Sequence, residues 1–338
     1  MAPEGTPIRK VVITEFGDVD KVQVLDDVCP PPPADHIQIK TEYTGFSGAD
    51  VNMRKGFYPL QKKAPLTPGY CLVGTVNAVG ESAKEFKVGD VVAVLTKYDA
   101  EAELVNQPEK YCIPVPEGVD HKQACAILTD WNTAYGMVVR TAKVQKGQKV
   151  FVHGMSGAVG TALMVISKLQ GAEVYGTASE RNHEEVKKFG GNPFVYSNKD
   201  WIKAITDLGG VDAVFDPLGY ESFDESYSIL NSTGILVAYG NNKGSLENGE
   251  LKSPLPALLK LFARNLNPLT KRSTTFFGLT RDSQWYKPNV TTLFDLVKNG
   301  TITVPIKTVW DMEDIQTAHR NWGGGSGVGS LLIKVAKD

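Results

Sequence analysis

The chain has 338 residues with a formal net charge of −2, and 42% of them are hydrophobic and 22% charged. These values are typical of a globular protein with one or two domains, and they exclude a global basic field that would hold nucleic acid or an anionic membrane. No apolar run approaches the roughly 18 residues of a bilayer span, and the N-terminus lacks the apolar core of a signal peptide. We therefore expect a cytoplasmic protein.

Cysteines and histidines show no metal-binding pattern. The four cysteines form no CxxC pair, and the five histidines form no HExxH-like pair. We expect buried, reduced thiols and no bound metal.

The first third of the chain has the pattern of β-structure. Short apolar runs are separated by Gly, Pro and Asp, and they lie at 9–16, 36–43, 72–80 and 91–95. The prolines at 30–33 predict a stiff, extended connection. This pattern predicts a partly open β-barrel or a sandwich.

Strands and helices alternate after residue 124. A stretch at 123–141 has helical spacing of small and apolar residues. Strands are then predicted at 148–154, 173–179, 211–219 and 234–240, and helices at 158–171, 182–191 and 254–266. Such alternation indicates a parallel sheet with right-handed crossovers. The tail at 329–338 is again β-like and could return to the first domain.

A glycine motif lies between the strand at 148–154 and the helix at 158–171. Gly154, Gly157 and Gly160 form a GxxGxxG pattern that follows a strand and opens a helix, as a dinucleotide fingerprint does. Glycines let the backbone approach a pyrophosphate, and the helix N-terminus offers it free N–H groups and partial positive charge. An ordinary tight turn is the alternative.

The end of the next strand selects the form of the cofactor. An NAD site usually presents Asp or Glu there to the ribose. This chain has Ser179, which can hydrogen-bond a 2′-phosphate, and Arg181, which can pair with it. Glu180 between them could instead face the ribose. The residues favour NADPH over NADH.

Segments spread over nearly the whole chain form a specific set: GFSGAD, TPGYCLVGTV, VGDVVAVL, VPEGVDHKQACAILTDWNTAY, VFVHGMSGAVG, VYGTAS, VDAVFDPLG, GILVAYG and VGSLLIKV. Together they resemble the zinc-free medium-chain dehydrogenase/reductases, in particular the quinone oxidoreductase family and its vesicle-associated branch. The resemblance implies an α/β protein with a GroES-like β-barrel catalytic domain (1–127 and 300–338) and a Rossmann domain with a doubly wound parallel sheet (128–299). It also implies NADPH and a homodimer.

The resemblance carries cofactor contacts over by position. Tyr196 joins Ser179 at the 2′-phosphate, Thr133 lies near the nicotinamide, and Gly240 and Asn241 line the loop after the fifth strand. The pyrophosphate would lie on Gly154, Ser156, Gly157, Ala158, Val159 and Gly160. Two positions depart from the family: Asn182 stands where a Lys is usual, and Gly325 where some relatives carry an Arg, so the 2′-phosphate clamp is expected to be weaker.

The zinc ligands of the zinc-dependent relatives are replaced. Ser47 takes the position of their Cys, Tyr70 that of their His, and Cys71 that of the following Glu. Asn52 replaces a Tyr that is proposed as proton donor in some zinc-free relatives. Ser47, Asn52, Tyr58 or Tyr70 could donate a hydrogen bond to the carbonyl oxygen of an acceptor, and each could instead have only a structural role. Asp50 could simply hold the loop.

The stretch Leu246–Leu279 is expected to shape the substrate end of the cleft, or to form an interface helix and a core strand. Phe276 and Phe277 could pack there on a flat substrate, and Phe277 is also a candidate cofactor contact. The sequence thus predicts an NADPH-dependent, metal-free reductase of a quinone or an α,β-unsaturated carbonyl compound. Two alternatives remain: a low-turnover NADPH-binding protein acting through partners or membranes, and a pathway-specific enoyl reductase of secondary metabolism.

Overall fold

The computed structural model describes residues 5–246 and 253–336. They divide into two compact units. Unit 1 is Met1–Asn132, Thr280–Gly324 and Ser330–Asp338, and unit 2 is Thr133–Leu279 and Gly325–Gly329. The part 247–252 of the stretch expected to shape a substrate cleft lies outside the described residues.

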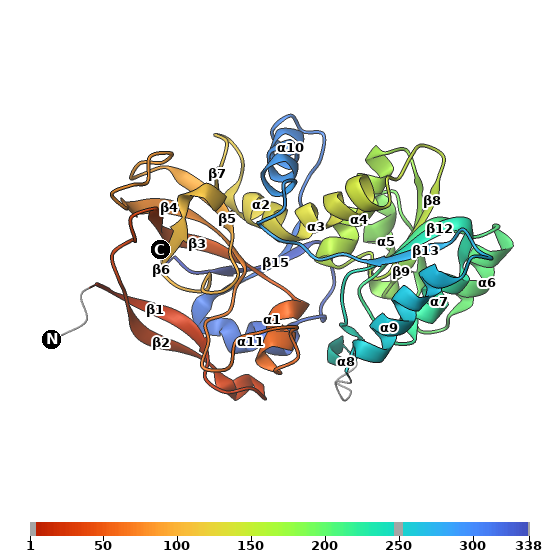
Figure 1. The fold of residues 1–338 in the computed structure, drawn as a ribbon, viewed down its shortest axis with the longest axis horizontal. Coiled ribbons are helices and arrows are strands. Elements are labelled where there is room, and N and C mark those ends of the chain that lie inside the picture. Colours follow the sequence, from red (N-terminus) through yellow and green to blue (C-terminus); the bar gives the residue numbers. More distant parts are fainter. Residues whose placement is uncertain (1–4, 247–252, 337–338) are drawn as a thin grey trace. The chain divides into compact units, whose positions relative to one another are not determined.

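Unit 1 is built on a mostly antiparallel sheet of strand order β14-β15-β3-β4-β5-β7, with β6 paired to β3 and a separate β1–β2 pair (Figure 1). Its strands are β1 (Thr6–Ile13), β2 (Val22–Cys29), β3 (His36–Phe46), β4 (Cys71–Val79), β5 (Val91–Leu95), β6 (Leu104–Pro108), β7 (Cys112–Pro114), β14 (Ile306–Asp311) and β15 (Ser330–Lys334). The four predicted apolar runs all fall on these strands. The tail returns to this unit as β15, as expected, and pairs with β3.

Helical segments complete unit 1: α1 (Gly48–Arg54), α2 (His121–Ala126), the π-helical η3 (Ile127–Trp131), α10 (Tyr286–Lys298), α11 (Ile315–Asn321) and the short turns η1 (Val19–Lys21), η2 (Glu109–Tyr111) and η7 (Met312–Asp314). The expected boundaries, 127/128 and 299/300, assigned α10 to the other domain. In the structure it belongs to unit 1, because the Tyr286 hydroxyl accepts from Leu95 N (2.8 Å) and donates to Tyr111 O (3.3 Å).

Unit 2 contains a parallel sheet of order β10-β9-β8-β11-β12-β13. The strands are β8 (Lys149–Val152), β9 (Glu173–Ala178), β10 (Asn192–Val195), β11 (Val211–Asp216), β12 (Leu230–Ala238) and β13 (Ser273–Phe276). Counted along the chain this order is 3-2-1-4-5-6, the doubly wound topology of dinucleotide-binding sheets. The predicted parallel sheet is confirmed.

Helices pack on this sheet, as Figure 1 shows for α4, α7 and α9. The helical segments are η4 (Gly136–Thr141), α4 (Ala158–Leu169), η5 (Glu180–Asn182), α5 (His183–Lys188), α6 (Asp200–Asp207), α7 (Ser222–Ser228), α8 (Lys243–Leu246), α9 (Leu255–Ala263) and η6 (Arg264–Leu266); α3 (Asn132–Tyr135) crosses the unit boundary. None of the helices in the described ranges combines the length and the apolar character that a membrane span requires.

Candidate functional site

The glycine motif of unit 2 forms a tight turn from β8 into α4. Gly154 has φ +69°, and its N–H lies 3.3 Å from Thr177 Oγ1. A Cβ on Gly160 would lie 2.0 Å from Gly154 O, so only glycine lets the helix approach the loop this closely. A Cβ on Gly154 would meet nothing within 4 Å, and no side chain caps the N-terminus of α4 at Gly157. The space beside Gly154 is therefore open, and the first N–H groups of α4 have no side-chain cap, two features that suit a phosphate group.

The strand β9 ends beside this turn, as the parallel register requires. Ser179 is half-buried, and Arg181 is exposed with its Nε donating to Gly325 O at 3.1 Å. Asn182 is buried, and its Oδ1 accepts from Gly327 N at 3.0 Å. The residue at the family's Lys position therefore anchors the 325–329 loop instead of reaching toward a phosphate. Tyr196, just after β10, is 61% exposed.

The remaining cofactor candidates lie in two places of unit 2. Gly240 and Asn241 follow β12, and Asn241 Nδ2 donates to the Tyr220 hydroxyl at 3.1 Å. Thr133 is half-buried on α3. The Phe277 ring packs on Gly136, where a Cβ would come within 2.6 Å of the ring, so Phe277 is at least a packing residue of this unit.

The sequence analysis missed a buried polar network under the glycine turn. His153 lies 3.2 Å from Thr177 Oγ1 and 3.0 Å from Ser226 Oγ. Asp216, fully buried at the end of β11, accepts from the hydroxyls of Ser222 (2.7 Å) and Ser226 (2.6 Å). Burial lowers the pKa of His153, which keeps the ring neutral. The network connects the carboxyl ends of β8, β9 and β11, at the edge of the sheet where the cofactor candidates lie.

In unit 1, three candidate groups meet in one hydrogen-bonded cluster at the start of α1. Ser47 is the N-cap of α1 and forms a capping box with Asp50, whose Oδ2 accepts from Ser47 N at 2.8 Å. The Tyr70 hydroxyl donates to the same Oδ2 at 2.8 Å and lies 2.6 Å from Ser47 Oγ. Ser47 Oγ also accepts from Ala49 N at 3.2 Å. Ser47 and Tyr70 are half-buried, whereas Asp50 is completely buried.

The electrostatics of this cluster follow from burial. Desolvation raises the pKa of Asp50 to about 7, although the hydrogen bonds from Ser47 and Tyr70 oppose the shift. Burial and the Asp50 charge raise the pKa of Tyr70 well above its usual value. The cluster therefore contains a carboxyl group that changes protonation near neutral pH, next to two hydroxyls.

The other two catalytic candidates lie outside the cluster. Asn52 is buried on α1, and its carbonyl accepts from Phe57 N at 2.9 Å. Tyr58 is 36% exposed, and burial followed by the Asp50 charge raises its pKa. Cys71 is fully buried, with its sulfur 4.0 Å from that of Cys125. As expected, it is a packing residue.

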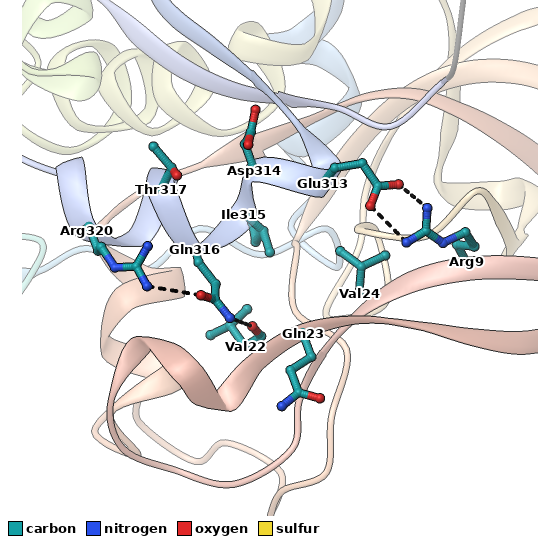
Figure 2. Close-up of a pocket in the computed structure, with 10 residues that line it drawn as sticks. All are labelled: Arg9, Val22, Gln23, Val24, Glu313, Asp314, Ile315, Gln316, Thr317 and Arg320. Carbon is teal, nitrogen blue, oxygen red and sulfur yellow. Dashed lines mark hydrogen bonds and ion pairs between the residues drawn. The ribbon is translucent and has the colours of Figure 1, made fainter.

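Two open surface pockets of unit 1 contain none of the predicted site residues. Figure 2 shows one of about 360 Å³, in which Arg9 pairs with Glu313 and Arg320 donates to Gln316 at 3.1 Å. The other, of about 340 Å³, has the Tyr111 ring 4.0 Å from the Arg281 guanidinium. Across residues 5–246 and 253–336, no group of three or more His, Cys, Asp or Glu side chains is arranged to hold a metal ion.

Known proteins resemble both units. The family model described as alcohol dehydrogenase GroES-like domain matches residues 33–144, and the one described as zinc-binding dehydrogenase matches residues 158–298. The synaptic vesicle membrane protein VAT-1 homolog of Rattus norvegicus is 30% identical over 97% of this chain and 84% of its own length. The quinone oxidoreductase of Homo sapiens is 27% identical over 98% of this chain and 99% of its own.

Solved structures give the same result. A mycobacterial protein in complex with NADPH superposes with a TM-score of 0.85 at 25% identity, and the match covers 97% of this chain and all of that one. The expected combination of a GroES-like domain with a Rossmann-type sheet is therefore confirmed.

Proposed function

The chain belongs to the medium-chain dehydrogenase/reductase family, in its quinone oxidoreductase branch, and from this premise we propose that it reduces a conjugated carbonyl acceptor with NADPH. The acceptor class is a quinone or an α,β-unsaturated carbonyl compound. One observation carries the proposal: at the positions of the zinc ligands of zinc-dependent relatives, this chain has a hydrogen-bonded pair of hydroxyls, Ser47 and Tyr70. Hydroxyls can polarise a carbonyl oxygen and give it a proton.

The residues of unit 2 fit NADPH. The open, glycine-lined turn and the uncapped start of α4 would hold the pyrophosphate. Ser179 and Arg181 would hold the 2′-phosphate, with Tyr196 beside them and Arg181 oriented by Gly325 O. Thr133, Gly240, Asn241 and Phe277 are the proposed contacts with the rest of the cofactor.

The cluster at Ser47 does not fit a catalytic zinc ion. Zinc takes three or four ligands from Cys, His and carboxylates, whereas two of the positions here are neutral hydroxyls already hydrogen-bonded to each other. We therefore propose reduction without metal. When bound, NADPH would supply the hydride; the protein would orient the acceptor and stabilise the negative charge that develops on its oxygen. Ser47 and Tyr70 are the proposed donors, while Asn52 and Tyr58 stay candidates for lining the pocket.

The proposed function is tested by NADPH oxidation with quinones, simple enones and enoyl thioesters. Reduction of quinones or simple enones supports it. Reduction of enoyl thioesters alone indicates a narrow enoyl reductase. Tight NADPH binding without turnover on any acceptor overturns the proposal and favours a cofactor-binding protein that acts through partners or membranes.

Replacing Arg181 with alanine is expected to weaken NADPH binding by about tenfold, equivalent to about 1.4 kcal/mol, because a charge-assisted contact with the 2′-phosphate is lost. NADH binding should change less than twofold. Fluorescence titration with both nucleotides measures the two effects, and Arg320→Ala in unit 1 serves as the control. Equal losses for NADPH and NADH would reject the 2′-phosphate assignment.

We further propose a homodimer that forms through α9 and η6. Four large apolar side chains there (Leu255, Leu259 and Phe262 on α9, and Leu266 on η6), together with Leu269 just beyond η6, are between 49% and 93% exposed. The three on α9 follow the i, i+4, i+7 spacing of one helix face. This spacing is that of a helix–helix seam, and a second copy supplies a matching one. The two neighbouring cations, Lys260 and Arg264, already pair with Asp224, which disfavours an anionic membrane as the occupant.

The double change Leu259→Glu and Phe262→Glu is expected to convert the dimer to a monomer of 36.7 kDa, because the two glutamates of each copy would be buried opposite those of the other copy. Light scattering after size exclusion measures the mass. Leu208→Glu, at a leucine 43% exposed on unit 2, is the control and should stay dimeric. A monomeric wild type would overturn this proposal.

The four cysteines are reduced and buried, which supports a cytoplasmic location.

A further inference from the structure

A second buried carboxyl group lies beside the hydroxyl cluster. Glu101, between β5 and β6, is completely buried, and neither of its carboxyl oxygens has a hydrogen-bond partner among the described residues. Its backbone is fixed, since its N–H donates to Pro68 O (3.3 Å) and its carbonyl accepts from Val11 N (2.9 Å). A Cβ on Gly69 would lie 3.0 Å from Glu101 Cγ, so this side chain packs against the residue that precedes Tyr70.

Within the described ranges of the chain, no cationic side chain pairs with either of the two buried carboxyls. The titratable groups that face Asp50 are Tyr58, Tyr70 and Glu101. Arg54, one turn along α1, makes no ion pair with Asp50 in the described part of the chain. Burial and the Asp50 charge raise the pKa of Glu101 well above its usual value. Because an uncompensated buried charge is costly, Glu101 stays protonated while Asp50 gains or loses its proton near pH 7.

The protonation of Asp50 sets the direction of the hydrogen bonds in the cluster. When Asp50 is ionised, Tyr70 donates to its Oδ2, and Ser47 donates to Tyr70, so no hydroxyl proton points outward. When Asp50 is neutral with its proton on Oδ2, it donates to Tyr70, and Tyr70 donates to Ser47 Oγ. Ser47 Oγ already accepts from Ala49 N, so its own proton is then free to point away from the cluster.

We propose that Ser47 protonates the reduced acceptor and that Asp50 is the internal proton source, which acts on Ser47 through Tyr70. This inference rests on the proposed reductase function and deepens it. The acceptor gains a hydride from the cofactor at carbon and a proton from Ser47 at oxygen. Ser47 recovers a proton from Tyr70, and Tyr70 recovers one from Asp50. Asp50 is left as a carboxylate and takes a proton from solvent before the next turnover, so each cycle consumes one proton.

The arrangement predicts different behaviour toward two kinds of acceptor. An enone needs a hydride and a proton, whereas an N-alkylphenazinium cation accepts a hydride without a proton. The wild-type enone rate should fall as pH rises above about 7, because only the neutral form of Asp50 supplies a proton. The phenazinium rate, corrected for the uncatalysed reaction, should stay constant.

Asp50→Asn and Tyr70→Phe test the relay. Both should lower the enone rate by about 100-fold and remove its dependence on pH between 6 and 9, and the enone rate should fall at least tenfold more than the phenazinium rate. The asparagine can still accept from Ser47 N, and the phenylalanine leaves the capping box intact. A loss of enone activity that both variants share therefore reports on the proton relay and not on a damaged start of α1. NADPH affinity reports on folding.

Glu101→Gln is the matched control, since it replaces a buried carboxyl that is already neutral. It should keep both the enone rate and its pH profile. If Asp50→Asn or Tyr70→Phe retains the wild-type profile, or if Glu101→Gln loses as much activity as Asp50→Asn, the relay is wrong. If the wild type reduces neither acceptor, the proposed function itself has failed, and the two failures are thereby distinguished.

Discussion

Replacing Gly160 with alanine is expected to lower the affinity for NADPH by on the order of 100-fold. The new Cβ would lie 2.0 Å from Gly154 O and 2.8 Å from Gly154 C, both backbone atoms that cannot rotate away. The first turn of α4 must therefore separate from the loop, and this movement displaces the N–H groups that are proposed to bind the pyrophosphate. Isothermal titration with NADPH measures the loss.

Gly157 offers the control for this prediction. Its Cβ would come only within 3.3 Å of Gly154 O, a contact that a shift of a few tenths of an ångström relieves. Gly157→Ala should therefore lose less than about tenfold in affinity, the equivalent of about 1.4 kcal/mol. If Gly160→Ala binds NADPH as well as the wild type, the pyrophosphate does not lie on this turn. Equal losses in both variants would mean that added methyl groups, rather than the close approach at Gly160, disturb the loop.

The architecture of unit 2 could be predicted because its signals are local. A strand such as 148–154 is apolar and short, the following helix has an apolar face, and Gly154 and Gly160 mark the turn between them. These patterns depend on the spacing of apolar residues and on the positions of glycines, and both can be seen directly in the sequence. The domain boundary near α10 depends instead on Tyr286 reaching Leu95, a contact between residues far apart in sequence.

The cluster in unit 1 could be predicted only in part. The family resemblance identified Ser47 and Tyr70, whereas Asp50 was expected only to hold the loop, and the structure shows that it also caps α1 through the capping box with Ser47. Nothing local to Glu101 in the sequence indicates burial, since glutamate is almost always exposed. Its position follows from the 96–103 segment folding back on Gly69. Asn182 was identified only as a departure from the Lys that is usual in the family, and the fold shows that it anchors the 325–329 loop.

Asp130 should make the protein less stable as the pH rises, and Asp130→Asn should remove this effect. Asp130 is 7% exposed, and burial raises its pKa to about 7, although the Ser330 hydroxyl donates to it at 2.6 Å. In the unfolded chain its pKa is near 3.9. Between about pH 4 and pH 7 the folded state therefore binds more protons than the unfolded state, and the free energy of unfolding falls with rising pH.

The variant should match the wild type within about 1 kcal/mol at pH 4 and exceed it by on the order of 2 kcal/mol at pH 8. Denaturant unfolding at several pH values measures the difference in the free energy of unfolding between the variant and the wild type. Asp50 is present in both proteins, so its contribution cancels in this difference. Asp282→Asn is a control of opposite sign, because the hydrogen bond from Tyr111 lowers the pKa of that exposed carboxyl. Removing the Asp282 carboxylate should destabilise the protein slightly at pH values above 4. A difference between Asp130→Asn and the wild type that does not change with pH would mean that Asp130 is ionised in the folded protein, with a solvent path or a cation compensating its charge.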